Sequence, residues 1–69
     1  MTKHPIPHEI TLIAIMEENG KLLIVDIIET SNHFAPTFTR AWLKMPEIVE
    51  IRTCRPHATE WHIHKIKRN

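Results

Sequence analysis

Residues 9–30 read EITLIAIMEENGKLLIVDIIET, and this stretch decides the fold. An Asn-Gly pair between two apolar runs is a strong signal for a β-hairpin with a two-residue turn. The turn at Asn19 and Gly20 places Glu18 opposite Lys21. The sequence therefore predicts two antiparallel strands, at residues 9–18 and 21–30.

This register makes both faces of the hairpin apolar, because side chains alternate between the faces of a strand. One face is expected to carry Ile10, Leu12, Ala14, Met16, Leu23, Val25 and Ile27. The other is expected to carry Ile13, Ile15, Leu22, Ile24 and Ile28, with Thr11, Asp26 and Glu17 among them. A chain of 69 residues builds one small core. The second face is therefore expected to bind a partner, unless residues 1–8 or the C-terminal tail fold across it.

The rest of the chain predicts one helix and further strands. Residues 1–8, with two prolines, are expected to form an extended lead-in. Apolar residues at helical spacing predict a helix over 37–45. A half-buried strand is expected over 47–55, with Val49, Ile51 and Thr53 on one side and Ile48, Glu50, Arg52 and Cys54 on the other. Residues 61–67 alternate well enough for a last strand or for a tail packed on the sheet edge, with Trp61 and Ile63 as its anchors.

The expected fold class is α+β, in one small domain spanning residues 1–69. Its elements follow the chain order strand, strand, helix, strand, with a possible fourth strand, and the helix covers one face of a small antiparallel sheet. An aromatic stripe of Phe34, Phe38 and Trp42 is expected to face the sheet. Its expected contacts are Leu12, Ala14, Val25 and Ile27, with Val49 and Ile51 completing the core.

Charge and cysteine content narrow the class of protein. The net charge is +1, which argues against a protein built mainly to coat nucleic acid. Among the charged residues, acidic ones outnumber basic ones in the first thirty positions, and basic ones outnumber acidic ones in the remainder. A single cysteine, Cys54, excludes an internal disulfide and favours a reducing compartment. Since no apolar run suits a signal peptide or a bilayer, a cytoplasmic protein without membrane contact is expected.

The candidate reactive residues lie near the C-terminus. Cys54, His57, His62 and His64 have a spacing that would suit zinc if the last two strands paired with Cys54 opposite His62. Solvent-facing histidines without that role are the favoured alternative, so no metal or cofactor is expected. No Gly-rich phosphate loop or nucleophile setting is present, so the chain is expected not to be an enzyme.

Basic residues offer an alternative function, a small nucleic-acid-binding module. Arg52, Arg55, Lys65, Lys67 and Arg68 would form a basic strip with Trp61 among them, of the kind that binds phosphates and stacks bases.

Residues 28–58 also carry a resemblance. The residues involved are Glu29-Thr30, Trp42, Pro46, Val49 and the run Arg52-Thr53-Cys54-Arg55-Pro56. Taken together, these residues resemble the small early podovirus protein that inhibits bacterial RNA polymerase. The resemblance implies that Arg52, and Arg55 as the second arginine, grip an acidic surface of the polymerase. Because they are three residues apart, a regular strand would direct them to opposite faces.

These observations predict a non-enzymatic, phage- or mobile-element-encoded inhibitor that occludes a surface of a bacterial host protein, in the host cytoplasm. RNA polymerase and a defence complex are both compatible targets. The expected partner-binding residues are Ile13, Ile15, Ile24, Arg52 and Arg55. A homodimer through the three isoleucines is a compatible arrangement.

Overall fold

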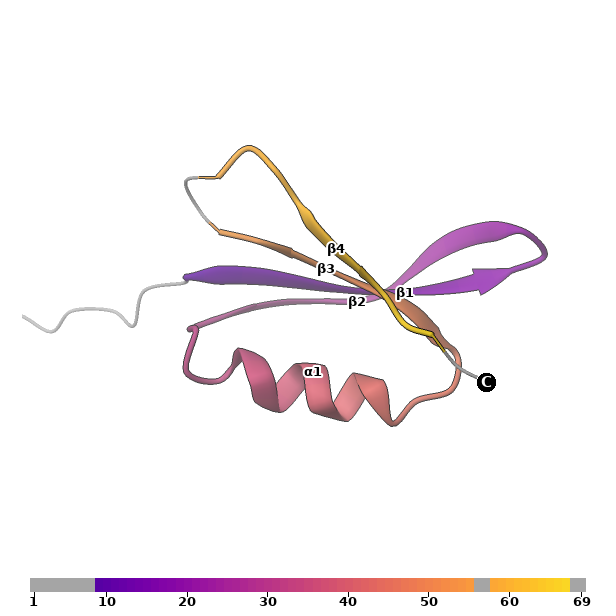
Figure 1. Ribbon diagram of the computed structural model, residues 1–69, viewed down its shortest axis with the longest axis horizontal. Coiled ribbons are helices and arrows are strands. Elements are labelled where there is room, and N and C mark those ends of the chain that lie inside the picture. Colours follow the sequence, from indigo (N-terminus) through magenta and orange to yellow (C-terminus); the bar gives the residue numbers. More distant parts are fainter. Residues whose placement is uncertain (1–8, 56–57, 68–69) are drawn as a thin grey trace, which may run out of the picture.

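The computed structural model describes residues 9–55 and 58–67, which form a four-stranded antiparallel sheet and one helix (Figure 1). The strands are β1 (Ile10–Glu18), β2 (Lys21–Thr30), β3 (Ile48–Cys54) and β4 (His62–Lys65), and the helix α1 (Ala35–Leu43) connects β2 to β3. Within the sheet, however, the strands lie side by side in the order β2-β1-β3-β4. This spatial order differs from the order strand, strand, helix, strand in which the elements were expected along the chain. The possible fourth strand is formed.

The hairpin turn has the predicted geometry. Asn19 has a φ of 53° and Gly20 a φ of 81°, both in the left-handed region that a two-residue hairpin turn requires. Glu18 pairs with Lys21, and the predicted register holds as far as the pair Ile15 and Ile24. The sequence therefore predicted this end of the hairpin correctly.

A β-bulge then shifts the register between Ala14 and Ile15. Ile15 pairs with Ile24 but Ala14 pairs with Asp26, so Val25 is the extra residue in β2. Beyond this point every β2 side chain lies on the face opposite to the one predicted. Ile28 packs against the core, whereas Val25 and Ile27 are 45% and 54% exposed. Their predicted place under the helix was therefore wrong.

A second irregularity lies between Ile15 and Met16 on the β3 side, where Ile15 pairs with Glu50 and Met16 pairs with Ile48. Val49 is the extra residue here and is only half-buried. Ile48 consequently joins Ile51 on the helix side of the sheet and is fully buried in the core. A strictly alternating strand would have placed Ile48 beside Glu50, as the sequence predicted.

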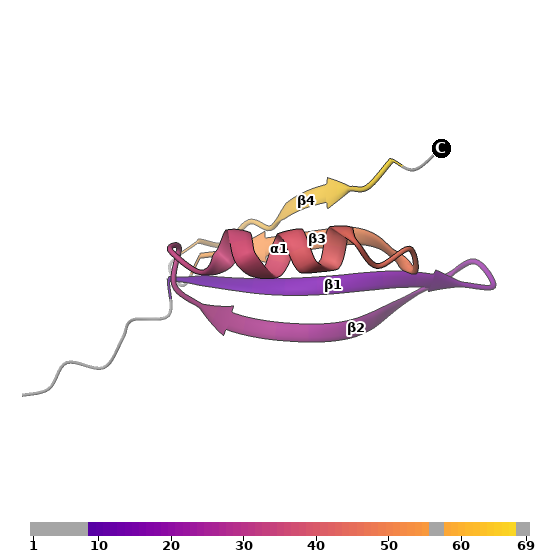
Figure 2. The ribbon, with the colours of Figure 1, turned by 90° about the horizontal axis from the view of Figure 1, so that it is seen from below.

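The helix lies across one face of the sheet (Figure 2). The buried core consists of Leu12, Ala14, Ala35, Trp42, Ile48 and Ile51. Phe38 packs against this core as predicted, but Phe34 is 53% exposed and its predicted place in the core is wrong. The reason is that the helix begins at Ala35, so Phe34 is its N-cap residue and makes an edge-to-face contact with His33, with ring centroids 5.0 Å apart.

The C-terminal tail extends the sheet. β4 pairs with β3, and the amide of Ile66 donates a hydrogen bond to the carbonyl of Val49. Ile66 packs against the core, whereas Trp61 and Ile63 are 44% and 53% exposed. The predicted anchors of this strand were therefore wrong, and Ile66 takes their place. The tail adds Ile63 to the second face of the sheet instead of folding across that face.

The predicted lead-in at residues 1–8, one of the two segments expected as a possible cover for the second face, lies outside the described residues. Within residues 9–55 and 58–67, no helix is long and apolar enough to cross a membrane.

Candidate protein interface

The face of the sheet opposite α1, which we call the open face, has at its centre two rows of residues that run across all four strands. Shorter rows flank them on either side: Glu29, Thr11 and Cys54 beyond the first row, and Leu22 and Glu17 beyond the second. Pairing between adjacent strands defines each row, since directly opposed residues share a face. The first row is Ile27, Ile13, Arg52 and Ile63. The second row is Ile24, Ile15, Glu50 and Lys65. No described helix or strand lies over these rows (Figure 1).

Large apolar side chains dominate the accessible part of the open face. Ile24 is 60% exposed, Ile27 54% and Ile63 53%. Leu22, opposite Glu17 at the hairpin end, is 51% exposed. Ile13 is half-buried and Ile15 is buried, so they form the floor between the more exposed outer strands. Contiguous exposed apolar area of this kind marks an interaction surface in a small protein.

An ion pair lies in the middle of this apolar surface. The Arg52 guanidinium donates through Nε to Glu50 Oε2 at 2.5 Å. Glu50 is 5% exposed, while about a third of the Arg52 side chain is accessible. The two residues are neighbours on one face of β3 because they are two positions apart. Arg52 thus compensates the buried carboxylate and keeps donor groups available at the surface.

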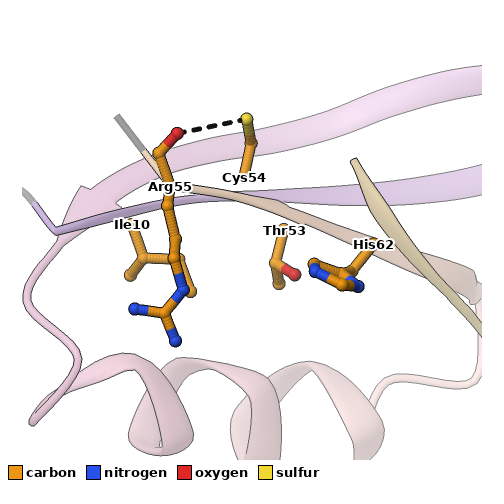
Figure 3. A pocket seen from close by; sticks show the side chains of 5 residues that line it. All are labelled: Ile10, Thr53, Cys54, Arg55 and His62. Atoms are coloured by element: carbon orange, nitrogen blue, oxygen red, sulfur yellow. Dashed lines mark hydrogen bonds between the residues drawn. The ribbon is translucent and has the colours of Figure 1, made fainter. Parts of the chain in front are cut away.

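Arg55 lies on the other side of the sheet. Figure 3 shows Ile10, Thr53, His62 and Arg55 on the side that faces α1, whereas Cys54 points the opposite way. These five residues line a shallow pocket of about 190 Å³ at the end of β3. The structure therefore separates the two arginines, as their spacing in a strand predicted. Arg52 lies on the open face, and Arg55 does not share it.

The strand register also separates the residues considered for zinc. Thr53, not Cys54, pairs with His62, so Cys54 lies on the face opposite to His62 and His64. The predicted pairing of Cys54 with His62 was wrong, because β3 and β4 pair one residue away from that register. The Cys54 thiol instead lies 3.4 Å from the Arg55 carbonyl and 3.6 Å from the Ala58 carbonyl. Among the described residues, no group of side chains could hold a metal ion, and His57 lies outside them.

The basic residues considered for nucleic acid are spread over the sheet. Arg52 and Lys65 lie on the open face on either side of Glu50, and Arg55 lies on the helix side. Lys67 is exposed beyond β4, and Arg68 lies outside the described residues. The structure therefore does not gather the described members of this set into one strip.

Two exposed isoleucines of the open face were missed from the sequence, and the ion pair at its centre was not recognised. Ile27 was assigned to the helix side because no sequence signal located the bulge at Val25. Ile63 was predicted to anchor the last strand, although its alternation with His62 and His64 is equally consistent with exposure. Glu50 was placed on the correct face but not as the partner of Arg52, although the spacing of two residues signals a shared face.

Comparison of the chain with protein-family models, with curated proteins and with solved structures found no match.

Proposed function

We propose that the chain is a non-enzymatic protein-binding module that works by occluding a surface of a bacterial protein. The observation that carries the proposal is the open face, where exposed isoleucines surround the ion pair of Arg52 with Glu50. Apolar side chains supply affinity when a partner covers them, and an arginine at the centre adds specificity.

Arg52 is the candidate for contact with an acidic group of the target, since its side chain is partly accessible while one donor engages Glu50. Arg55, on the other side of the sheet, would contribute only if the target wrapped around the end of β3. The resemblance of residues 28–58 makes bacterial RNA polymerase the first target to test. A host defence complex is the second target, and a phage or mobile element is the proposed source.

The test is affinity capture from a nuclease-treated bacterial lysate with three tagged baits: the wild-type chain, Ile24→Asp and Phe34→Asp. Ile24 and Phe34 are similarly exposed, at 60% and 53%, but only Ile24 lies on the open face. The proposal predicts that the wild type and Phe34→Asp retain one host protein in near-stoichiometric amount and that Ile24→Asp does not.

Two results would contradict the proposal. Recovery of the same protein by all three baits would assign binding to another surface. Recovery of nucleic acid without nuclease, with no protein retained after nuclease, would favour the nucleic-acid-binding alternative.

A further inference from the structure

The two rows of the open face have complementary composition. Read from β2 to β4, the first row is Ile27, Ile13, Arg52 and Ile63, and the second is Ile24, Ile15, Glu50 and Lys65. Isoleucine stands beside isoleucine on β2 and β1, and a cation stands beside an anion on β3. A partner presenting the same rows in reverse order would therefore match these two central rows position by position.

A second copy of the chain presents that pattern. We propose that two copies stack through their open faces about a two-fold axis that runs across the strands, between the two rows. This axis places Ile27 over Ile24 of the second copy, Ile13 over Ile15, and Arg52 over Glu50. Each contact occurs twice, as in any isologous interface.

The charges select this axis over the alternative one. A two-fold axis parallel to the strands would stack each row on itself in reversed strand order, with Arg52 over Ile13 and Glu50 over Ile15. That arrangement would press the accessible part of the Arg52 guanidinium against an apolar side chain and give the already buried Glu50 carboxylate no cation from the second copy, which is costly. The axis across the strands instead joins the two intrachain pairs into a four-membered network of alternating charge.

The outer strands also suit this arrangement. Ile63 lies over Lys65 of the second copy, whose aliphatic stem covers the isoleucine while the ammonium group reaches the rim. On β2, the exposed Ile24 of each copy covers the exposed Ile27 of the other copy. Face-to-face packing of two sheets about 10 Å apart is the ordinary way in which apolar sheet faces are buried.

This inference rests on the proposed function in one respect, namely that the open face is the interaction surface. The second copy is then its occupant in the absence of a target, and a target must displace that copy. Self-association and target binding consequently compete for the same side chains.

The test is the oligomeric state of the wild type and two charge-reversal variants, measured by sedimentation velocity. In the Arg52→Glu variant both members of the ion pair are acidic, and in the Glu50→Arg variant both are basic. Each variant repels its own copy, so both are expected to be monomers. Mixed together they restore opposite charges at both contacts and are expected to form a 1:1 heterodimer of about twice the chain mass of 8.1 kDa.

The matched controls are Lys44→Glu and Glu47→Arg, which make the same charge changes at exposed positions outside the open face. Both are expected to dimerise like the wild type. If either central variant lacks the circular dichroism spectrum of the folded chain, Ile24→Asp and Ile27→Asp replace the pair, and both are expected to be monomers.

A wild-type chain that stays monomeric at about 1 mM, the weak end of measurable association, would overturn the inference. Dimers that persist in the folded reversal variants or in the replacement pair would overturn the geometry. A monomeric wild type that still captures a host protein through Ile24 would refute the dimer and leave the proposed function standing. A wild-type dimer that Ile24→Asp dissociates, together with no captured host protein, would support the dimer and contradict the proposed function.

Discussion

Arg52 is bound through Nε to Glu50 Oε2 at 2.5 Å, and this pair holds a buried carboxylate among the isoleucines of the open face. The finding changes how Arg52 is tested. Replacing Arg52 removes a surface cation and also leaves Glu50 without its partner. Ile24, which the structure places on the open face without such a link, is the cleaner position for probing partner binding.

Removal of Arg52 alone is expected to destabilise the fold. Arg52→Ala should lower the free energy of unfolding by about 1–2 kcal/mol, because Glu50 loses a charge-assisted hydrogen bond that is only partly shielded from water. Replacing both members, as in Arg52→Met with Glu50→Leu, should recover much of the loss, since no buried charge then remains. Urea unfolding of the wild type and both variants measures the difference. Equal stability of Arg52→Ala and the wild type would show that the pair contributes nothing.

The two tryptophans are expected to differ sharply. Trp42 is 4% exposed in the core and Trp61 is 44% exposed before β4. Trp42→Ala should cost about 3–5 kcal/mol through lost burial and the cavity left under the sheet. Trp61→Ala should cost no more than about 0.5–1 kcal/mol. Thermal or urea unfolding checks both, and comparable losses would contradict the packing of α1 on the sheet.

The bulge at Val25 predicts which of two neighbouring isoleucines contributes more to the stability of the fold. Ile28 packs against the core and Ile27 is 54% exposed, so Ile28→Ala should destabilise the monomer by about 1–2 kcal/mol more than Ile27→Ala. Unfolding must be followed at concentrations where the chain is monomeric. The reverse ranking would indicate the unbulged hairpin register that simple alternation predicts.

Gly20 tests the turn. Its φ of 81° is unfavourable for a residue with a Cβ, although a Cβ there would meet nothing within 4 Å. Gly20→Ala should therefore cost about 1 kcal/mol from backbone strain alone. Asn19→Gly, at a φ of 53°, is the control and should be nearly neutral. A neutral Gly20→Ala variant in urea unfolding would argue against the two-residue turn.

The sequence predicted the parts of the fold that depend on local pattern. The Asn19-Gly20 turn, the helix carrying Phe38 and Trp42, and the alternation of Glu50, Arg52 and Cys54 on one side of β3 are all confirmed. Each follows from a short-range rule, either turn chemistry or side-chain periodicity.

The remaining features depend on packing between distant segments. The bulge at Val25 exchanges the roles of Ile27 and Ile28, and apolar residues on both sides of β2 leave no periodic signal that could locate it. The β3–β4 register separates Cys54 from His62, and that register is set by pairing across the intervening loop instead of by local sequence. The open face was anticipated, but two of its exposed isoleucines, Ile27 and Ile63, were not.

The proposed function requires that the open face bind a protein target. Its most direct test is calorimetric titration of the captured host protein with the wild-type chain, Ile24→Asp and Phe34→Asp. We expect Ile24→Asp to raise the Kd at least about tenfold, the equivalent of 1.4 kcal/mol, and Phe34→Asp to leave it unchanged. An unchanged Kd for a folded Ile24→Asp chain would contradict the claim.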